Sequence, residues 1–263
     1  MNSIIPNRHA RSARGALLVL ALTMGFDQPA TVLAGGFNIA WNDCGTNGAD
    51  SRSFACNSES GTNVFYISAM PDSPIPQLVA FDASISVYSS ASTLSPWWHL
   101  ESSGGCRSRS LSANFSFTTG PFSCEDPWGG NAAGGISWQY YDLTSSSRAR
   151  IKVVCAVQPS ASITANPGNE YYLCSIAINN SGATSSSCAG CSDALCFVLD
   201  QVVLSQPSTD LSQPPTLGPQ VLNTALLRQK ITWQSGASSS GSGCAAINTP
   251  KQSTWGGLKS LYH

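Results

Sequence analysis

Charged residues are scarce in this sequence. Asp, Glu, Lys and Arg make up only 10% of the 263 residues, whereas a typical soluble domain has about 25%. The formal net charge is −1, and neither a basic stripe nor an acidic tail stands out. We therefore expect no nucleic-acid partner and no attraction to an anionic membrane surface.

Groups suited to catalysis are also few. Beyond the N-terminal region the only histidines are His99 and His263, and no G-x-S-x-G nucleophile motif is present, so a Ser-His-Asp triad would depend on His99. Glu101, Glu125 and Asp126 lie in expected loops. A pair of these carboxylates acting on a polysaccharide remains the alternative to a protein without enzymatic activity.

The longest apolar run belongs to the N-terminus. Positive Arg8, Arg11 and Arg14 precede the run Ala16–Phe26, which is shorter than the ~20 residues that span a bilayer. Val32-Leu33-Ala34 follows as a cleavage site. The pattern predicts a signal peptide over residues 1–34 and an exported protein without membrane insertion after its removal; an N-terminal anchor is the alternative.

Helical periodicity is almost absent, and two-residue alternation takes its place. In VAFDASISV, Val79, Phe81, Ala83, Ile85 and Val87 fall on one face and polar or small residues on the other. This alternation is typical of a strand that has one buried face and one solvated face.

Similar runs recur between Gly-, Ser-, Asn- and Pro-rich turns, and we expect strands at 37–41, 63–69, 111–117, 136–141, 149–157, 171–178, 195–204 and 226–234. Many short strands predict an all-β, antiparallel β-sandwich, immunoglobulin-like or jelly-roll-like. We interpret residues 35–263 as one domain with a long Pro-rich loop at 206–220 and a docked C-terminal tail at 244–263.

Ten cysteines follow the predicted signal peptide. An even number of cysteines in an exported chain indicates a disulfide framework. A loop at about Pro159–Asn169 separates two expected strands, and Cys155 and Cys174 are equidistant from the point between residues 164 and 165. If the flanking strands form a hairpin, the two cysteines face each other at a distance suited to a disulfide.

The other pairings are predicted from proximity along the chain. Cys44–Cys56 and Cys106–Cys124 would each close a short loop, stabilising the fold by about 3 kcal/mol. The stretch CAGCSDALCF contains three cysteines within nine residues. Together with Cys244 they would supply four thiolates, the number that a structural zinc site needs. Because an oxidising compartment favours disulfides, we expect Cys188–Cys196 and Cys191–Cys244 instead, the second tying the C-terminal segment to the sandwich.

Two sets of residues are candidate binding sites. Trp97 and Trp98 are adjacent on an expected strand, so one would face away from the core, and Trp128 lies in the turn-like EDPWGG. Exposed tryptophans can stack on a sugar or anchor a protein partner, although covering loops would bury them. NDCGTNGAD fails the EF-hand pattern, but Asp43, Asn47 and Asp50 remain candidate calcium ligands. An Asx-rich turn is the alternative. No other cofactor is expected.

Several stretches together resemble a group of exported bacterial proteins that often end in a Thr-Trp-Gly, Lys, Leu-Tyr pattern; they are PWWHL, Cys106-Arg107, EDPWGG, CAGCSDALC, ITWQSG and TWGGLKSLYH. The resemblance covers most of the chain after residue 34. It implies bacterial export and a single domain, with no activity or site residues attached. Proteins of this group usually end in a basic residue, and in this sequence His263 takes its place.

The composition and the strands favour a structural or binding module without enzymatic activity. We expect it to be secreted, at the cell surface or in the periplasm. Its expected partner is a glycan or an extracellular protein, recognised through surface aromatic residues. A secreted hydrolase that acts on polysaccharide through loop carboxylates is the alternative.

Overall fold

The structure is a computed structural model, and it describes residues 35–89, 91–101, 105–117, 120–121, 123–140, 147–207, 220–221 and 229–234. The predicted signal peptide, most of the Pro-rich loop and the predicted docked tail lie outside these residues. The described residues are almost entirely strands and short turns, which confirms the all-β, antiparallel prediction.

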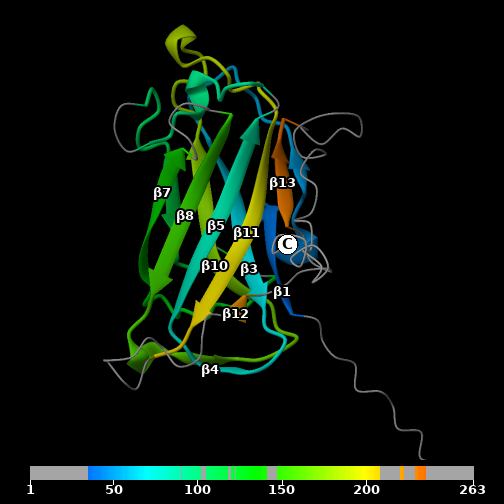
Figure 1. Cartoon of the computed structure of the whole chain (residues 1–263), viewed down its shortest axis with the longest axis vertical. Coiled ribbons are helices and arrows are strands. Elements are labelled where there is room, and N and C mark those ends of the chain that lie inside the picture. Colours follow the sequence, from blue (N-terminus) through cyan, green and yellow to red (C-terminus); the bar gives the residue numbers. More distant parts are fainter. Residues whose placement is uncertain are drawn as a thin grey trace, which may run out of the picture. The chain divides into compact units, whose positions relative to one another are not determined.

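Two sheets form the sandwich (Figure 1). The smaller sheet has the strand order β1 (Gly36–Trp41), β3 (Thr62–Met70), β10 (Tyr171–Asn179) and β6 (Leu111–Asn114). The larger has the order β2 (Ser51–Arg52), β13 (Lys230–Trp233), β11 (Leu195–Ser205), β5 (Ala80–Ser89), β8 (Arg148–Ala156) and β7 (Ala133–Tyr140), and β12 (Gln220–Val221) also pairs with β11. All pairs are antiparallel except β13 with β2.

Shorter elements connect these strands. β4 (Ile75–Leu78) and β9 (Ile163–Ala165) form a separate two-stranded sheet. Four single-turn 3-10 helices lie in the described loops, η1 (Gly45–Asn47), η2 (Pro96–Trp98), η3 (Pro159–Ala161) and η4 (Ser186–Cys188). The structure describes no helix long and apolar enough to cross a membrane.

The alternating pattern places the core as expected. In β5, Phe81, Ala83, Ile85 and Val87 are buried between the sheets, while Asp82 on the other face forms an ion pair with Lys152 of β8. β1 packs beside β13, which brings aromatic side chains of both sheets together at that side. There the ring of Trp41 lies 5.3 Å from Phe65 and 6.0 Å from Trp233, measured between centroids.

A buried arginine completes this end of the core. The side chain of Arg107 is almost fully buried. Its guanidinium lies 3.3 Å from the centroid of the Trp97 ring and donates hydrogen bonds to the carbonyl oxygens of Ser181, Trp97 and Asn179. Burial lowers the pKa of Arg107 to about 9, so the side chain remains charged at neutral pH. It binds three backbone carbonyls at once, in η2, at the end of β10 and in the loop after β10.

The disulfides join segments that are far apart in the sequence. The bonds are Cys44–Cys124, Cys56–Cys191 and Cys106–Cys188. The predicted pairs Cys44–Cys56, Cys106–Cys124, Cys188–Cys196 and Cys191–Cys244 are therefore wrong. Cys196 is also disulfide-bonded, and Cys244 lies outside the described residues. The cluster CAGCSDALCF is a junction of disulfides, because its cysteines reach loops of distant strands.

The predicted Cys155–Cys174 disulfide is wrong as well, since both are free buried thiols. β8 and β10 do not form a hairpin; β8 pairs with β5 and β7, and β10 pairs with β3 and β6. The chain between them passes through β9, which pairs with β4, and then enters the other sheet. Burial raises the pKa of Cys155 to about 12, and it also raises the pKa of Cys174.

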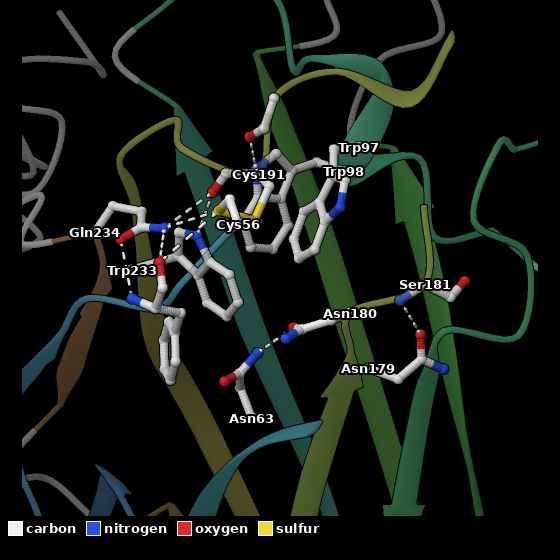
Figure 2. Close-up of a disulfide and its surroundings, with 12 residues drawn as sticks. Cys56, Asn63, Trp97, Trp98, Asn179, Asn180, Ser181, Cys191, Trp233 and Gln234 are labelled. Carbon is white, nitrogen blue, oxygen red and sulfur yellow. Dashed lines mark hydrogen bonds between the residues drawn. A yellow bond between two sulfur atoms is a disulfide. The ribbon is translucent and has the colours of Figure 1, made fainter. Parts of the chain in front are cut away.

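Figure 2 shows how one disulfide is embedded in this core. Trp233 donates its indole N–H to the carbonyl of Cys191 at 2.7 Å. The amide of Gln234 bonds both the N–H and the carbonyl of Phe54, at 3.0 and 2.9 Å. The Cys56–Cys191 bond therefore lies beside a group of hydrogen bonds that attach the end of β13 to the loop after β2.

Candidate functional site

The tryptophans predicted as a binding surface are buried. Trp97 and Trp98 are 0% exposed and Trp128 is 1% exposed. The segment Pro96–Trp98 is the 3-10 helix η2 rather than a strand, so both rings turn into the core. The indole N–H groups of Trp98 and Trp128 bond the carbonyls of Gly190 and Leu173. None of the three rings is available to a ligand.

The candidate calcium ligands do not form a common site. One oxygen of Asp43 accepts hydrogen bonds from the N–H of Cys44 and the hydroxyl of Ser123. Asn47 and Asp50 are exposed. Within the described residues no three or more His, Cys, Asp or Glu side chains are grouped as a metal site would require. The hydrogen bonds of Asp43 stabilise the turn that follows β1.

The loop acids Glu101 and Glu125 contact different sheets. Glu101 accepts a hydrogen bond from the Tyr140 hydroxyl at 2.8 Å, and the half-buried His99 ring lies 5.6 Å from that of Tyr140. Burial and this carboxylate raise the pKa of Tyr140. Glu125, by contrast, lies beside Tyr171 at the start of β10. Arg107 bonds the carbonyl of Asn179 at the other end of that strand.

Asp126 also has a structural role. Its carboxylate accepts a hydrogen bond from the N–H of Trp128 at 2.8 Å. Inverting and retaining glycosidases hold two carboxyl groups about 5–10 Å apart. Glu101 contacts β7 of the larger sheet, whereas Glu125 lies beside β10 of the smaller sheet and Asp126 bonds the N–H of Trp128.

The outer face of the larger sheet carries a group of positive side chains that the sequence did not lead us to predict. Residues 148, 150 and 152 alternate with buried residues along β8, so Arg148, Arg150 and Lys152 point to the same side, about 7 Å apart along the strand. Lys230 of β13 lies on this face too, because it pairs with Val198. We call these four residues and the side chains between them the basic sheet face.

Two carboxylates and a tyrosine contact these cations. Lys152 forms an ion pair with Asp82 at 3.0 Å. Asp200 accepts a hydrogen bond from Ser86, and burial raises its pKa, although Ser86 and the charge of Arg150 act in the opposite direction. The guanidinium of Arg148 lies 5.1 Å from the centroid of the Tyr88 ring. The cations are therefore held in place while remaining at the surface.

The charge of the described residues is unevenly distributed. The basic sheet face has four cations and two carboxylates. Elsewhere the described cations are Arg52, Arg107 and Arg109, and the carboxylates are Asp43, Asp50, Glu59, Asp72, Glu101, Glu125, Asp126, Glu170 and Asp193. A positive face on an otherwise acidic surface attracts an anionic ligand to that face.

Mostly polar residues lie between the charges. Rows of paired residues across β7, β8, β5 and β11 place Ser137, Ser84 and Gln201 beside Lys152, and Gln139 and Ser86 beside Arg150. Val154 on this face is the large hydrophobic residue that stands out as exposed among the described residues, at 48%. Ser84 and Ser86 are buried beneath the longer side chains, so the exposed polar groups are those of Ser137, Gln139 and Gln201. Val198 and Val203 of β11 are half-buried on the same face.

A signal for this site is present in the sequence. In RARIK, Arg148, Arg150 and Lys152 are spaced by two, which on a strand places them on one face. The overall charge hides this local pattern, and the expectation that no basic stripe exists is wrong. The contributions of Asp82, Asp200 and Lys230 depend on the strand order, which the sequence does not reveal.

Comparison of the chain with family models, curated proteins and solved structures gave no significant match.

Proposed function

We propose that this protein is a secreted binding module without enzymatic activity, and that it binds an anionic glycan through the basic sheet face. The observation that carries the proposal is the placement of Arg148, Arg150, Lys152 and Lys230 on one exposed sheet face of an otherwise acidic chain. The three disulfides indicate an oxidising compartment, which supports the secreted location.

The chemistry of the face favours a glycan over a protein partner. Guanidinium groups bind carboxylates and sulfates with paired hydrogen bonds, and the exposed side chains of Ser137, Gln139 and Gln201 can bond sugar hydroxyls. Protein interfaces usually have an apolar centre with aromatic anchors. Apart from Val154 this face has few such groups, and Tyr88 is half-buried beneath Arg148.

The test compares two variants of equal net charge. Arg150→Gln with Lys152→Gln removes two cations from the face, and Arg52→Gln with Arg109→Gln removes two exposed cations elsewhere. Binding to polygalacturonate, a uronic-acid polymer, is measured with uncharged dextran as the reference polymer. Each exposed charge pair contributes up to about 1 kcal/mol, so we expect the first variant to bind about tenfold more weakly.

The control pair separates the site from long-range attraction. If both variants lose affinity equally, the effect is one of total charge and the proposed site is wrong. Asp82→Asn provides a test in the opposite direction, because it frees Lys152 from its ion-pair partner. We expect Asp82→Asn to bind the polymer more tightly than the wild type.

The hydrolase is tested in the same samples. Reducing ends are measured after prolonged incubation with the polymer. Binding without release of new reducing ends supports a binding module. Release that is abolished by Glu101→Gln or Glu125→Gln would show that the loop carboxylates act on the glycan.

A further inference from the structure

β7 forms an open edge of the larger sheet. It pairs with β8 on one side, and among the described residues its backbone makes no hydrogen bond beyond that pairing. Every second residue of an edge strand points its N–H and C=O groups away from its neighbour. Ala133, Gly134, Gly135, Ser137 and Gln139 are exposed, so this row of backbone groups is accessible.

This edge lacks the features that usually protect an edge strand from pairing. Natural edges are short, or carry charges or proline. The opposite edge of the same sheet follows this rule, since β2 has two residues and one is Arg52. β7 has eight residues, AGGISWQY, without a charge or a proline.

We propose that β7 is a strand-pairing surface for a second copy of this chain, with β7 antiparallel to β7 about a two-fold axis. The uncharged sequence of β7 favours a copy of itself, because like charges do not meet across the new pair. A two-fold arrangement also uses the same edge on both copies and closes the assembly at two.

The geometry of the strand restricts the position of the axis. Residues directly opposite each other in an antiparallel pair lie on the same face, so the axis must pass beside a residue and not between two residues. An axis at Ser137 places Ser137 opposite Ser137, and it places Ile136 opposite Trp138 and Gly135 opposite Gln139. Hydroxyl pairs and pairs of a β-branched with an aromatic side chain are favourable neighbours across strands.

The same register places Gly134 opposite Tyr140 of the second copy. A side chain at Gly134 would contact the carbonyl of Val154 and the ring of Phe115, whereas a Cβ at Gly135 would meet nothing within 4 Å. A side chain at Gly135 therefore meets no obstacle in the monomer, and Ser137 is exposed, which makes both positions suitable for testing the dimer.

The test measures self-association of the exported chain by sedimentation velocity. One strand pair buries less than the ~1,200 Å² of a stable interface, so the concentration series extends to several hundred micromolar, at about 0.15 M salt. Ser137→Lys places two like charges opposite each other at the axis, and we expect it to weaken dimerisation at least tenfold. Val154→Lys adds the same charge to the exposed face of β8, away from the edge, and we expect it to dimerise as the wild type does.

A mixing experiment identifies the axis. Ser137→Glu alone should also be monomeric, and an equimolar mixture of Ser137→Lys and Ser137→Glu should restore the dimer. A wild-type chain that stays monomeric over the whole series overturns the proposal. So does a dimer that Ser137→Lys leaves intact, because its contact must then lie elsewhere.

Discussion

Replacement of Arg107 by methionine tests the account of the core most sharply. Methionine keeps most of the apolar stem but donates no hydrogen bond, so the carbonyls of Ser181, Trp97 and Asn179 lose their donor. Of the three acceptor residues Trp97 is buried, Asn179 is half-buried and Ser181 is exposed. A buried carbonyl left without a partner costs about 1–3 kcal/mol, and the lost cation–π contact with Trp97 costs up to about 2 kcal/mol. Removing a buried charge returns part of this cost.

We expect a net loss of about 3 kcal/mol in the free energy of unfolding. For a chain of this length that corresponds to a fall of about 6–12 °C in Tm. The assay is thermal and urea unfolding followed by circular dichroism. The control is Arg109→Met, the same change at an exposed arginine two residues away. If the two variants lose equal stability, by less than about 1 kcal/mol, Arg107 does not hold the loops together.

Two further predictions concern titratable groups. Burial raises the pKa of Asp200 above its ordinary value of 3.8. At pH values between the unfolded and the folded pKa, the native chain therefore binds more protons than the unfolded chain, and the free energy of unfolding falls as the pH rises through this range. Asp200→Asn lacks this loss, so its stability relative to wild type should increase from about pH 4 to pH 7 in urea unfolding; a constant difference would contradict the raised pKa. The buried thiols of Cys155 and Cys174 should be alkylated by iodoacetamide only after unfolding, because their raised pKa values and burial suppress the thiolate. Peptide mass mapping that shows native labelling, or no labelling after unfolding without reductant, would contradict free buried thiols.

The strands were largely predictable from the sequence. In Val79–Val87 the apolar residues of the alternating pattern are the ones that face the core, although Ser84 and Ser86 on the other face are buried as well. The same principle located β1, β3, β8, β10 and β11 to within one or two residues. It gave a β6 that is too long, because Phe115–Phe117 leave the ladder, and it missed β2, β4, β9 and β12, which are too short to show a pattern.

Pairing between strands was not predictable in the same way. Cys155 and Cys174 are symmetric about a loop, but that loop crosses between sheets. The cysteines of CAGCSDALCF bond the loops that follow β2 and η2. Distance along the chain carries no information about such contacts, because strand order in a sandwich brings distant segments together.

Only part of the candidate site could be predicted from the sequence. The alternation in RARIK is visible in the sequence, and it places three cations on one face. The burial of both Trp97 and Trp98 could not be predicted, because a 3-10 helix that begins at a proline takes the place of the expected strand and directs both rings inward. Trp97 and Trp98 therefore pack in the core and stabilise the fold.

The salt dependence of binding to polygalacturonate tests the central claim most directly. If the basic sheet face binds the polymer, log K falls linearly with log salt concentration, and the slope becomes shallower by up to about 1 for each cation removed at Arg150 and Lys152. The Arg52 and Arg109 variant should keep the wild-type slope. A slope that is the same for all three proteins, or affinity that does not depend on salt, would contradict the account.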